Sequence, residues 1–176
     1  MWNFKYKDDY LQQVSDLMDS TAVQAMRLLP QHVKSVSCYH HCVLVSYSSY
    51  RICAALGLDA RAAARGGLLH DLFLYNWMDP HSHPGVNHAL DHPAVALNNA
   101  RARFPITDKE ADIIATHMFP CTITKFYGCV ESFIVSTMDK LAAMAELLHL
   151  VPLITPEEIP AAQLCPAGHR EERLAS

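Results

Sequence analysis

The chain has 176 residues, of which 51% are hydrophobic and 18% are charged. This length fits one domain with a single core, and this balance of residues excludes an intrinsically disordered chain. The formal net charge of -4 provides no basic face for a nucleic-acid backbone, so a nucleic-acid polymer is not an expected partner.

The hydrophobic pattern is helical almost throughout the chain, with no sustained period-two alternation. It predicts a first amphipathic helix over about 10–29, which Pro30 ends, and a second over about 37–56, which Gly57 closes. A third helix is expected over about 59–75. The pattern in the first half of the chain therefore predicts three helices joined by short connections.

The second half begins with a polar, proline-containing stretch over 79–91, which predicts a loop. A short helix is expected from residue 93 to about 104, with its proline in the first turn. Residues 107–110 form a capping box, so a helix should begin there and stop before Pro120. A long apolar helix is expected over about 130–150.

These elements predict an all-α protein with a single domain. Residues 1–30 are expected to form an N-terminal helix packed on that domain, and residues 31–150 the domain itself. Residues 151–176 contain four prolines and a charged end, which predicts a loosely packed C-terminal tail.

The six cysteines show no C-x-x-C spacing, and the sequence shows no secretory signal. Reduced thiols and a cytoplasmic location are therefore expected. No apolar run is long enough to span a membrane, so a membrane is not an expected partner.

Adjacent His70 and Asp71 end a small, apolar helical segment. Burying both polar groups costs several kcal/mol unless something pairs with them, and a metal ion is a common partner. The plainer alternative is a buried aspartate that bonds a local histidine or caps a helix. Gly66 and Gly67 precede the pair, and two glycines inside a helix suggest that another helix approaches closely there.

Four more residues are candidate ligands. His41 shares a mostly apolar helix face, although alone it could be a hydrogen-bonded core histidine. His92 would lie at a helix start, where a capping role is the alternative. His117 lies near the carboxyl end of a helix, where the helix dipole favours a charged histidine. Asp139 lies in the middle of an apolar helix and has a poor explanation as a solvated residue.

The order and spacing of these residues resemble the HD-domain metal-dependent phosphohydrolase superfamily. The matching segments are HHCVLVSYSSYRICAALGLD, ARGGLLHDL and STMDKLAAM, and the resemblance covers about 33–146. It implies a helical bundle of the HD type. It also implies a first metal ion bound by His41, His70, Asp71 and Asp139.

DHPAVALNNA and IIATHMFP occupy the places where HD proteins with two metal ions have their extra ligands, here His92 and His117. The chain departs from the cyclic-di-GMP phosphodiesterase subgroup, which has paired histidines where this chain has His117 and Met118. It also lacks that subgroup's Gly-Tyr-Pro motif. Hydrolysis of cyclic-di-GMP is therefore not expected.

The resemblance implies a phosphohydrolase that acts on a nucleotide or another small phosphorylated metabolite. One or two divalent ions would bind, with Asp71 as the bridge between two, and iron, manganese, zinc, nickel and cobalt are all compatible with nitrogen and oxygen ligands. Lys140 and Arg65 are the expected catalytic contacts to phosphate, and Lys125 is a weaker candidate. For each of these three cations an ordinary surface role is the alternative.

Two other functions stay open. HD-fold di-iron oxygenases use similar ligands. A non-catalytic module would bind a nucleotide or metabolite at the same site without catalysing a reaction. HD proteins often form dimers, so a homodimer is also left open, but no surface in the sequence marks an interface.

Overall fold

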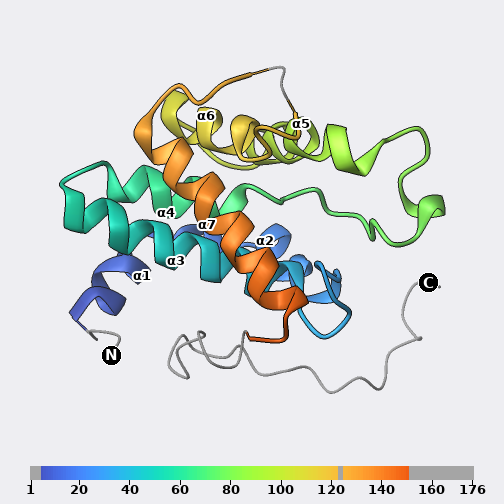
Figure 1. The fold of residues 1–176 in the computed structure, drawn as a ribbon, viewed down its shortest axis with the longest axis horizontal. Helices are drawn as coiled ribbons and strands as arrows, with labels where there is room; N and C mark the ends of the chain where they lie inside the picture. The colour runs from blue at the N-terminus through green and yellow to red at the C-terminus, as the bar shows by residue number, and fades with distance from the viewer. Residues whose placement is uncertain (1–4, 123–124, 151–176) are drawn as a thin grey trace.

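The computed structural model describes residues 5–122 and 125–150, and within these ranges it contains helices and no strand (Figure 1). The prediction of an all-α protein is confirmed. The helices are α1 (Lys5–Met18), α2 (Thr21–Ala25), α3 (Cys38–Leu56), α4 (Ala60–Leu69), α5 (His88–Arg101), α6 (Asp108–Thr116) and α7 (Val130–Leu147), with 3-10 turns at Met26–Leu28 and Pro80–Ser82.

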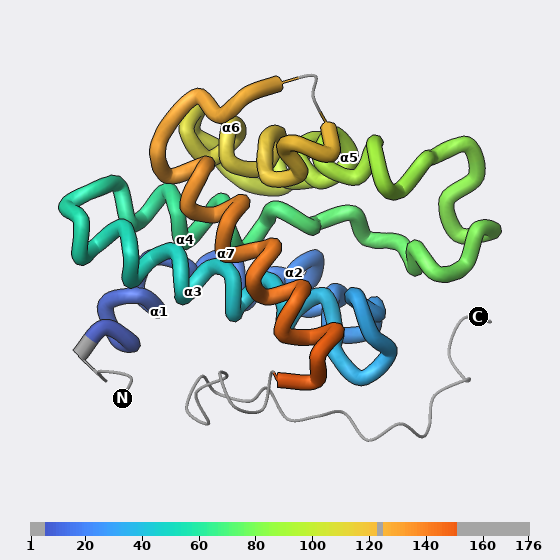
Figure 2. Tube along the Cα trace, in the orientation of Figure 1, coloured from blue at the N-terminus to red at the C-terminus, as the bar shows by residue number. Residues whose placement is uncertain are grey.

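α7 runs diagonally across α3 and α4, and α5 and α6 lie together on one side of this pair (Figures 1 and 2). α3 lies in the middle of the bundle, and most of its residues are buried. None of the helices in the described residues is long and apolar enough to cross a membrane. The predicted tail over 151–176 lies outside the described residues.

The single N-terminal helix expected over 10–29 is wrong, because the chain breaks at Ser20. α1 ends at Met18, and the Ser20 hydroxyl accepts a hydrogen bond from the Val23 N–H at 3.3 Å, which caps a new helix. Serine is favoured at this position because its side chain satisfies a free N–H group of the first turn. The segment after Ser20 therefore turns as α2 and a 3-10 turn.

The second helix is confirmed. The Ser37 hydroxyl accepts from the His40 N–H at the start of α3, and Gly57 closes it in the left-handed conformation with φ 69°. Glycine adopts this conformation without a steric penalty.

The close helix approach expected at the two glycines of α4 is also confirmed. A Cβ on Gly66 would lie 2.7 Å from Cγ2 of Ile113 in α6, and a Cβ on Gly67 would lie 3.0 Å from Cα of Ser46 in α3. α4 therefore touches both neighbours through positions that have no side chain.

α4 ends at Leu69, so the helix expected to continue to residue 75 is wrong. The Asn99 side-chain amide donates to the carbonyl groups of Leu72 and Phe73 at 2.9 and 3.3 Å. These carbonyl groups are satisfied by a side chain of α5 instead of by another helical turn. Leu74 then takes a positive φ of 60°, which turns the chain away.

α5 begins at His88, before the expected start at Pro93, and this shortens the predicted loop over 79–91. The Asp91 carboxylate accepts from the Asn87 N–H at 2.8 Å, which satisfies the backbone before the first turn. Pro93 then costs one hydrogen bond within the helix. The capping box of Thr107 and Glu110 is confirmed, and α7 ends at Leu147, near its predicted limit.

Candidate metal centre

Six buried side chains from the core helices meet at one place, and they are the six residues that the sequence singled out. They come from the first turn of α3, the ends of α4 and α6, the second turn of α5 and the middle of α7: His41, His70, Asp71, His92, His117 and Asp139. Each is at most 7% exposed. His92 lies inside α5 and not at a helix start, because α5 begins earlier than expected.

The Asp71 carboxylate lies between two groups of imidazoles. Its Oδ1 is 3.3 Å from Nε2 of His92 and 3.4 Å from Nε2 of His117. Its Oδ2 is 3.4 Å from Nε2 of His70. The two oxygens of one carboxylate therefore face different sets of donor atoms, as in a ligand that bridges two ions.

Asp139 completes the group around His70. Its Oδ1 is 3.0 Å from Nε2 of His41 and 3.6 Å from Nε2 of His70. Two ligand atoms that are 2.0–2.2 Å from one tetrahedral ion lie roughly 3.3–3.6 Å apart. Most of the spacings around Asp71 and Asp139 match this separation.

Three of the imidazoles are oriented by backbone carbonyl groups of their own helices. Their Nδ1 atoms donate as follows: His70 to Gly67 at 2.7 Å, His92 to His88 at 2.6 Å and His117 to Ile114 at 2.8 Å. In the neutral ring the proton then lies on Nδ1, and Nε2 faces the centre with its lone pair. The helix ends thus prepare three nitrogen ligands.

The donor atoms fit a metal ion better than they fit one another. Nε2 of His70 and Oδ1 of Asp71 are buried and have no hydrogen-bond partner. Nε2 of His92 and Nε2 of His117 are 2.9 Å apart, and with protons on both Nδ1 atoms two lone pairs would face each other. A cation satisfies all four atoms, and imidazole with carboxylate suits a divalent transition metal.

The electrostatics of the centre keep its two carboxylates ionised. Burial alone raises the pKa of Asp71, but the imidazoles of His70 and His117 outweigh it and hold that pKa well below its usual value. The same balance, with His41 and His70 as partners, lowers the pKa of Asp139. Both carboxylates are therefore ionised, which is the form that binds a metal ion.

Two further side chains form hydrogen bonds with the side chains of these ligands, and neither was predicted. Gln31 Nε2 donates to Oδ2 of Asp71 at 2.7 Å, and Glu146 Oε1 accepts from Nδ1 of His41 at 2.8 Å. Glu146 lies two helical turns after Asp139, so helical periodicity could have placed it on the same face. Gln31 lies in an irregular connection, where no periodicity indicates which residue it contacts.

An aromatic column lies against the His92 ring. The indole of Trp77 stacks on His88 at 5.2 Å, and His88 stacks on His92 at 4.7 Å. Tyr75 Oη lies 2.9 Å from Nδ1 of His88. Burial lowers the pKa of His88 to about 4, so its ring is neutral at physiological pH. The column therefore supports one face of the His92 ring.

The structure does not bring Arg65 to this centre. Its guanidinium is buried and pairs with Glu110 at 2.9 Å and with Asp16 at 2.7 Å. The expected contact to phosphate is therefore not supported, and the solvated alternative is wrong. Lys125 pairs with Asp112 at 2.9 Å.

Lys140 lies beside the centre and is half-buried. Its ammonium donates to the His117 carbonyl oxygen at 2.8 Å, to Ser136 Oγ at 2.7 Å and to the Ser136 carbonyl oxygen at 3.3 Å. All three hydrogens of the ammonium have an acceptor. To contact a phosphate, Lys140 would have to give up one of these bonds.

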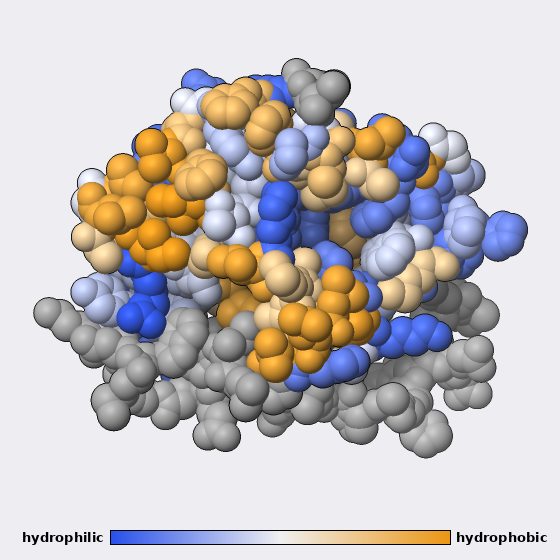
Figure 3. All heavy atoms as spheres, in the orientation of Figure 1, coloured by the Kyte–Doolittle hydropathy of each residue, from blue (hydrophilic) through white to orange (hydrophobic). Residues whose placement is uncertain are grey.

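Solvent reaches the edge of the centre. Asp139, Asp71 and His92 keep 7%, 5% and 5% of their surface exposed. The face drawn in Figure 3 is hollowed near its middle, and hydrophilic residues line the hollow.

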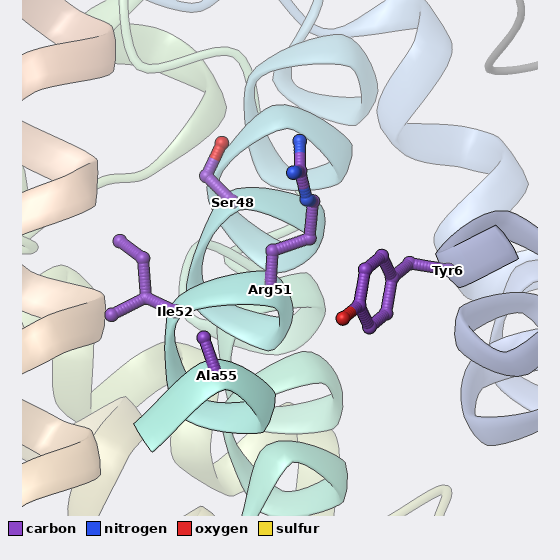
Figure 4. Close-up of a pocket in the computed structure, with 5 residues that line it drawn as sticks. All are labelled: Tyr6, Ser48, Arg51, Ile52 and Ala55. Carbon is purple, nitrogen blue, oxygen red and sulfur yellow. The ribbon is translucent and has the colours of Figure 1, made fainter. Parts of the chain in front are cut away.

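Two surface pockets lie apart from these six residues. One, of about 700 Å³, is lined by Phe119, Pro120, Phe126, Tyr127, Gly128, Cys129, Val130, Phe133, Thr137 and Lys140. The other, of about 400 Å³, lies between Tyr6 of α1 and one face of α3 formed by Ser48, Arg51, Ile52 and Ala55 (Figure 4). Neither brings together acidic or imidazole groups.

The HD domain family model matches residues 38–144, which is more than half of the chain. The chain therefore belongs to the HD domain family, whose members bind divalent metals and are generally metal-dependent phosphohydrolases. No curated protein and no solved structure matches the chain significantly. The six clustered residues all lie within the matched range, whereas Gln31 and Glu146 lie outside it.

Proposed function

We propose that this protein is a metal-dependent phosphohydrolase that cleaves a phosphoester bond of a nucleotide or another small phosphorylated metabolite. The observation that supports this most is the position of Asp71, whose two oxygens face different sets of imidazoles. Membership in the HD domain family supports the same reaction class.

His41, His70, Asp71 and Asp139 would hold one divalent ion, and Asp71, His92 and His117 would help to hold a second. Bound ions of this kind lower the pKa of a coordinated water and stabilise negative charge on phosphoryl oxygens. Two divalent ions and two carboxylates give the centre a net charge of roughly +2, which favours an anionic substrate. The groups around the ligands hold these side chains in place.

Those residues act by orientation and by charge. The backbone carbonyl groups behind His70, His92 and His117 fix the proton of each neutral ring on Nδ1 and aim Nε2 inward. Gln31 holds Oδ2 of Asp71, which leaves Oδ1 directed at His92 and His117. Because these contacts exist before any substrate binds, little reorganisation is needed during the reaction.

The test is elemental analysis of protein purified without chelator, followed by a phosphate-release assay on a panel of nucleotides and phosphomonoesters. We expect transition metal in the parent protein and metal-dependent phosphate release. Asp71→Ala should lose both, whereas Asp108→Asn, on the exposed first turn of α6, should keep both.

Other results would contradict the proposal. Oxygen consumption with bound iron and no phosphate release would favour a di-iron oxygenase. Bound metal with no turnover of any phosphoester would favour a binding module.

A further inference from the structure

A row of three hydrogen-bonded side chains, which the proposed function does not explain, begins at His41 and leads away from the centre. Glu146, whose side chain is fully buried, lies between His41 and His32. Its Oε1 is 2.8 Å from Nδ1 of His41, and its Oε2 is 2.7 Å from Nδ1 of His32. His32 is about a third exposed, so the row runs from the surface to a ligand of the centre.

These distances indicate hydrogen bonds and not another metal site, although the three residues could approach one ion. Separations of 2.7 and 2.8 Å are typical of charge-assisted hydrogen bonds. Ligands of a shared tetrahedral ion lie farther apart, at roughly 3.3 Å or more. The carboxylate therefore accepts one hydrogen bond from each ring.

Glu146 does for His41 what backbone carbonyl groups do for the other three imidazoles. It fixes the proton on Nδ1 and leaves Nε2 to face Asp139 at 3.0 Å. A carboxylate differs from a carbonyl group because it has a full negative charge, which makes the imidazole a stronger donor to a metal. The ion held by His41 gains from this difference, and the ion held by His92 and His117 does not.

His32 reaches Glu146 from a short connection that also supplies Gln31. This connection, residues 30–37, is closed by backbone pairing of Pro30 with Ser37, and the Gln31 N–H donates to the Val36 carbonyl at 2.9 Å. Two adjacent side chains of one closed loop thus contact the centre, one through Asp71 and one through Glu146. Both the loop and Glu146 lie outside the residues that the family model matches.

We propose that Glu146, oriented by His32, is the positioning residue of His41. It selectively raises the affinity for the metal ion that His41 binds. The inference rests on the metal centre of the proposed function and does not depend on its substrate. It makes the loop over 30–37 and the end of α7 part of the site.

The test compares Glu146→Gln with the parent protein by calorimetric titration of Co²⁺ and Mn²⁺ into metal-free protein. Glutamine keeps the shape of the side chain and one acceptor but removes the charge. We expect one ion to bind about 10- to 100-fold more weakly and the other to keep its affinity. The Co²⁺ absorption spectrum should change for the weakened ion alone. Met144→Gln, on the exposed side of the same helix, is the matched control and should change neither.

His32 gives a second, independent readout. His32→Ala should weaken the same ion by a smaller factor, and adding it to Glu146→Gln should have little further effect, because the two residues act through one contact. If the losses of metal affinity in the two variants were additive, His32 and Glu146 would not act through one contact, and the inference would be overturned.

Three other results would also overturn the inference: unchanged affinity for both ions in Glu146→Gln, equal loss of both ions in a variant that keeps its helical circular dichroism, or a third ion in the parent that the variant lacks. A parent protein that binds no ion would refute the proposed function as well. Normal binding by both the parent and Glu146→Gln would refute this inference alone.

Discussion

Gly67 lies directly against the backbone of Ser46, where a Cβ on residue 67 would be 3.0 Å from the Cα of residue 46. The Gly67 carbonyl oxygen also accepts the hydrogen bond from Nδ1 of His70. The packing of α4 on α3 and the orientation of a candidate ligand therefore depend on the same residue.

Gly67→Ala should lower the free energy of unfolding by about 1–3 kcal/mol, because the neighbouring atom belongs to the backbone and cannot rotate away. It should also weaken metal binding, since α4 must shift and His70 shifts with it. Urea unfolding and metal titration measure the two effects. Arg61→Ala, on the exposed side of α4, is the control. A Gly67→Ala variant as stable as the parent would show that the helices can separate without cost.

Four of the six clustered residues could be found from sequence because each has a polar group in an apolar, periodic setting, whereas His92 and His117 were indicated by the resemblance to HD proteins with two metal ions. His41 and Asp139 are set by helical phase, and the His70–Asp71 pair by its apolar surroundings. What failed depends on contacts between distant segments. α4 ends early because Asn99, from another helix, binds the carbonyl groups of Leu72 and Phe73.

Outer contacts were harder to predict than ligands for the same reason. Arg65 is of a residue type that usually lies at the surface, but here it is buried and forms ion pairs with Glu110 and Asp16 from two other helices. Gln31 reaches Asp71 from a connection that has no periodicity. A pattern along one helix cannot show which side chain a loop brings to it from 40 residues away.

Lys140 ties the end of α6 to α7 through the His117 carbonyl oxygen and Ser136. An ammonium at the carboxyl end of a helix is also favoured by the helix dipole. Lys140→Met should therefore lower the free energy of unfolding by about 1–3 kcal/mol and weaken the ion near His117. Thermal unfolding and metal titration check this. Unchanged metal affinity with a raised KM would instead indicate that Lys140 contacts the substrate phosphate.

Metal should stabilise the folded protein, because the unpartnered Nε2 of His70 and Oδ1 of Asp71 can bind an ion together in the folded state and not in the unfolded chain. At 100 times the Kd, a bound ion adds about 2.7 kcal/mol. For a chain of this size that gain corresponds to a rise in Tm of about 5–10 °C. Mn²⁺ should produce this rise in differential scanning fluorimetry, and a chelator should reverse it.

Mg²⁺ at the same concentration is the comparison, since four imidazoles suit a transition metal better than an ion that prefers oxygen ligands. Asp71→Ala should show no rise with either ion. An equal rise with Mg²⁺ and Mn²⁺ would argue against imidazole ligation.

Glu131 makes stability depend on pH at a place outside the metal centre. Its Oε1 accepts from Lys109 Nζ at 2.8 Å and from the Asp59 N–H at 3.0 Å. Burial raises the pKa of this carboxyl, but these hydrogen bonds outweigh burial and lower it from 4.5 to about 2. Because the pKa is lower in the folded state, the stabilisation is complete above pH 4.5 and is lost as the pH falls towards 2.

Glu131→Gln should therefore lower the free energy of unfolding by about 1–3 kcal/mol at pH 7, because the amide has no charge to offer Lys109. The difference between variant and parent should shrink at pH 3.5, where the unfolded parent has already taken up a proton at this carboxyl. Urea unfolding at both pH values measures it, with Asp108→Asn as an exposed control on α6. A difference that stays constant with pH would mean that Glu131 stabilises the protein by packing and not by its charge.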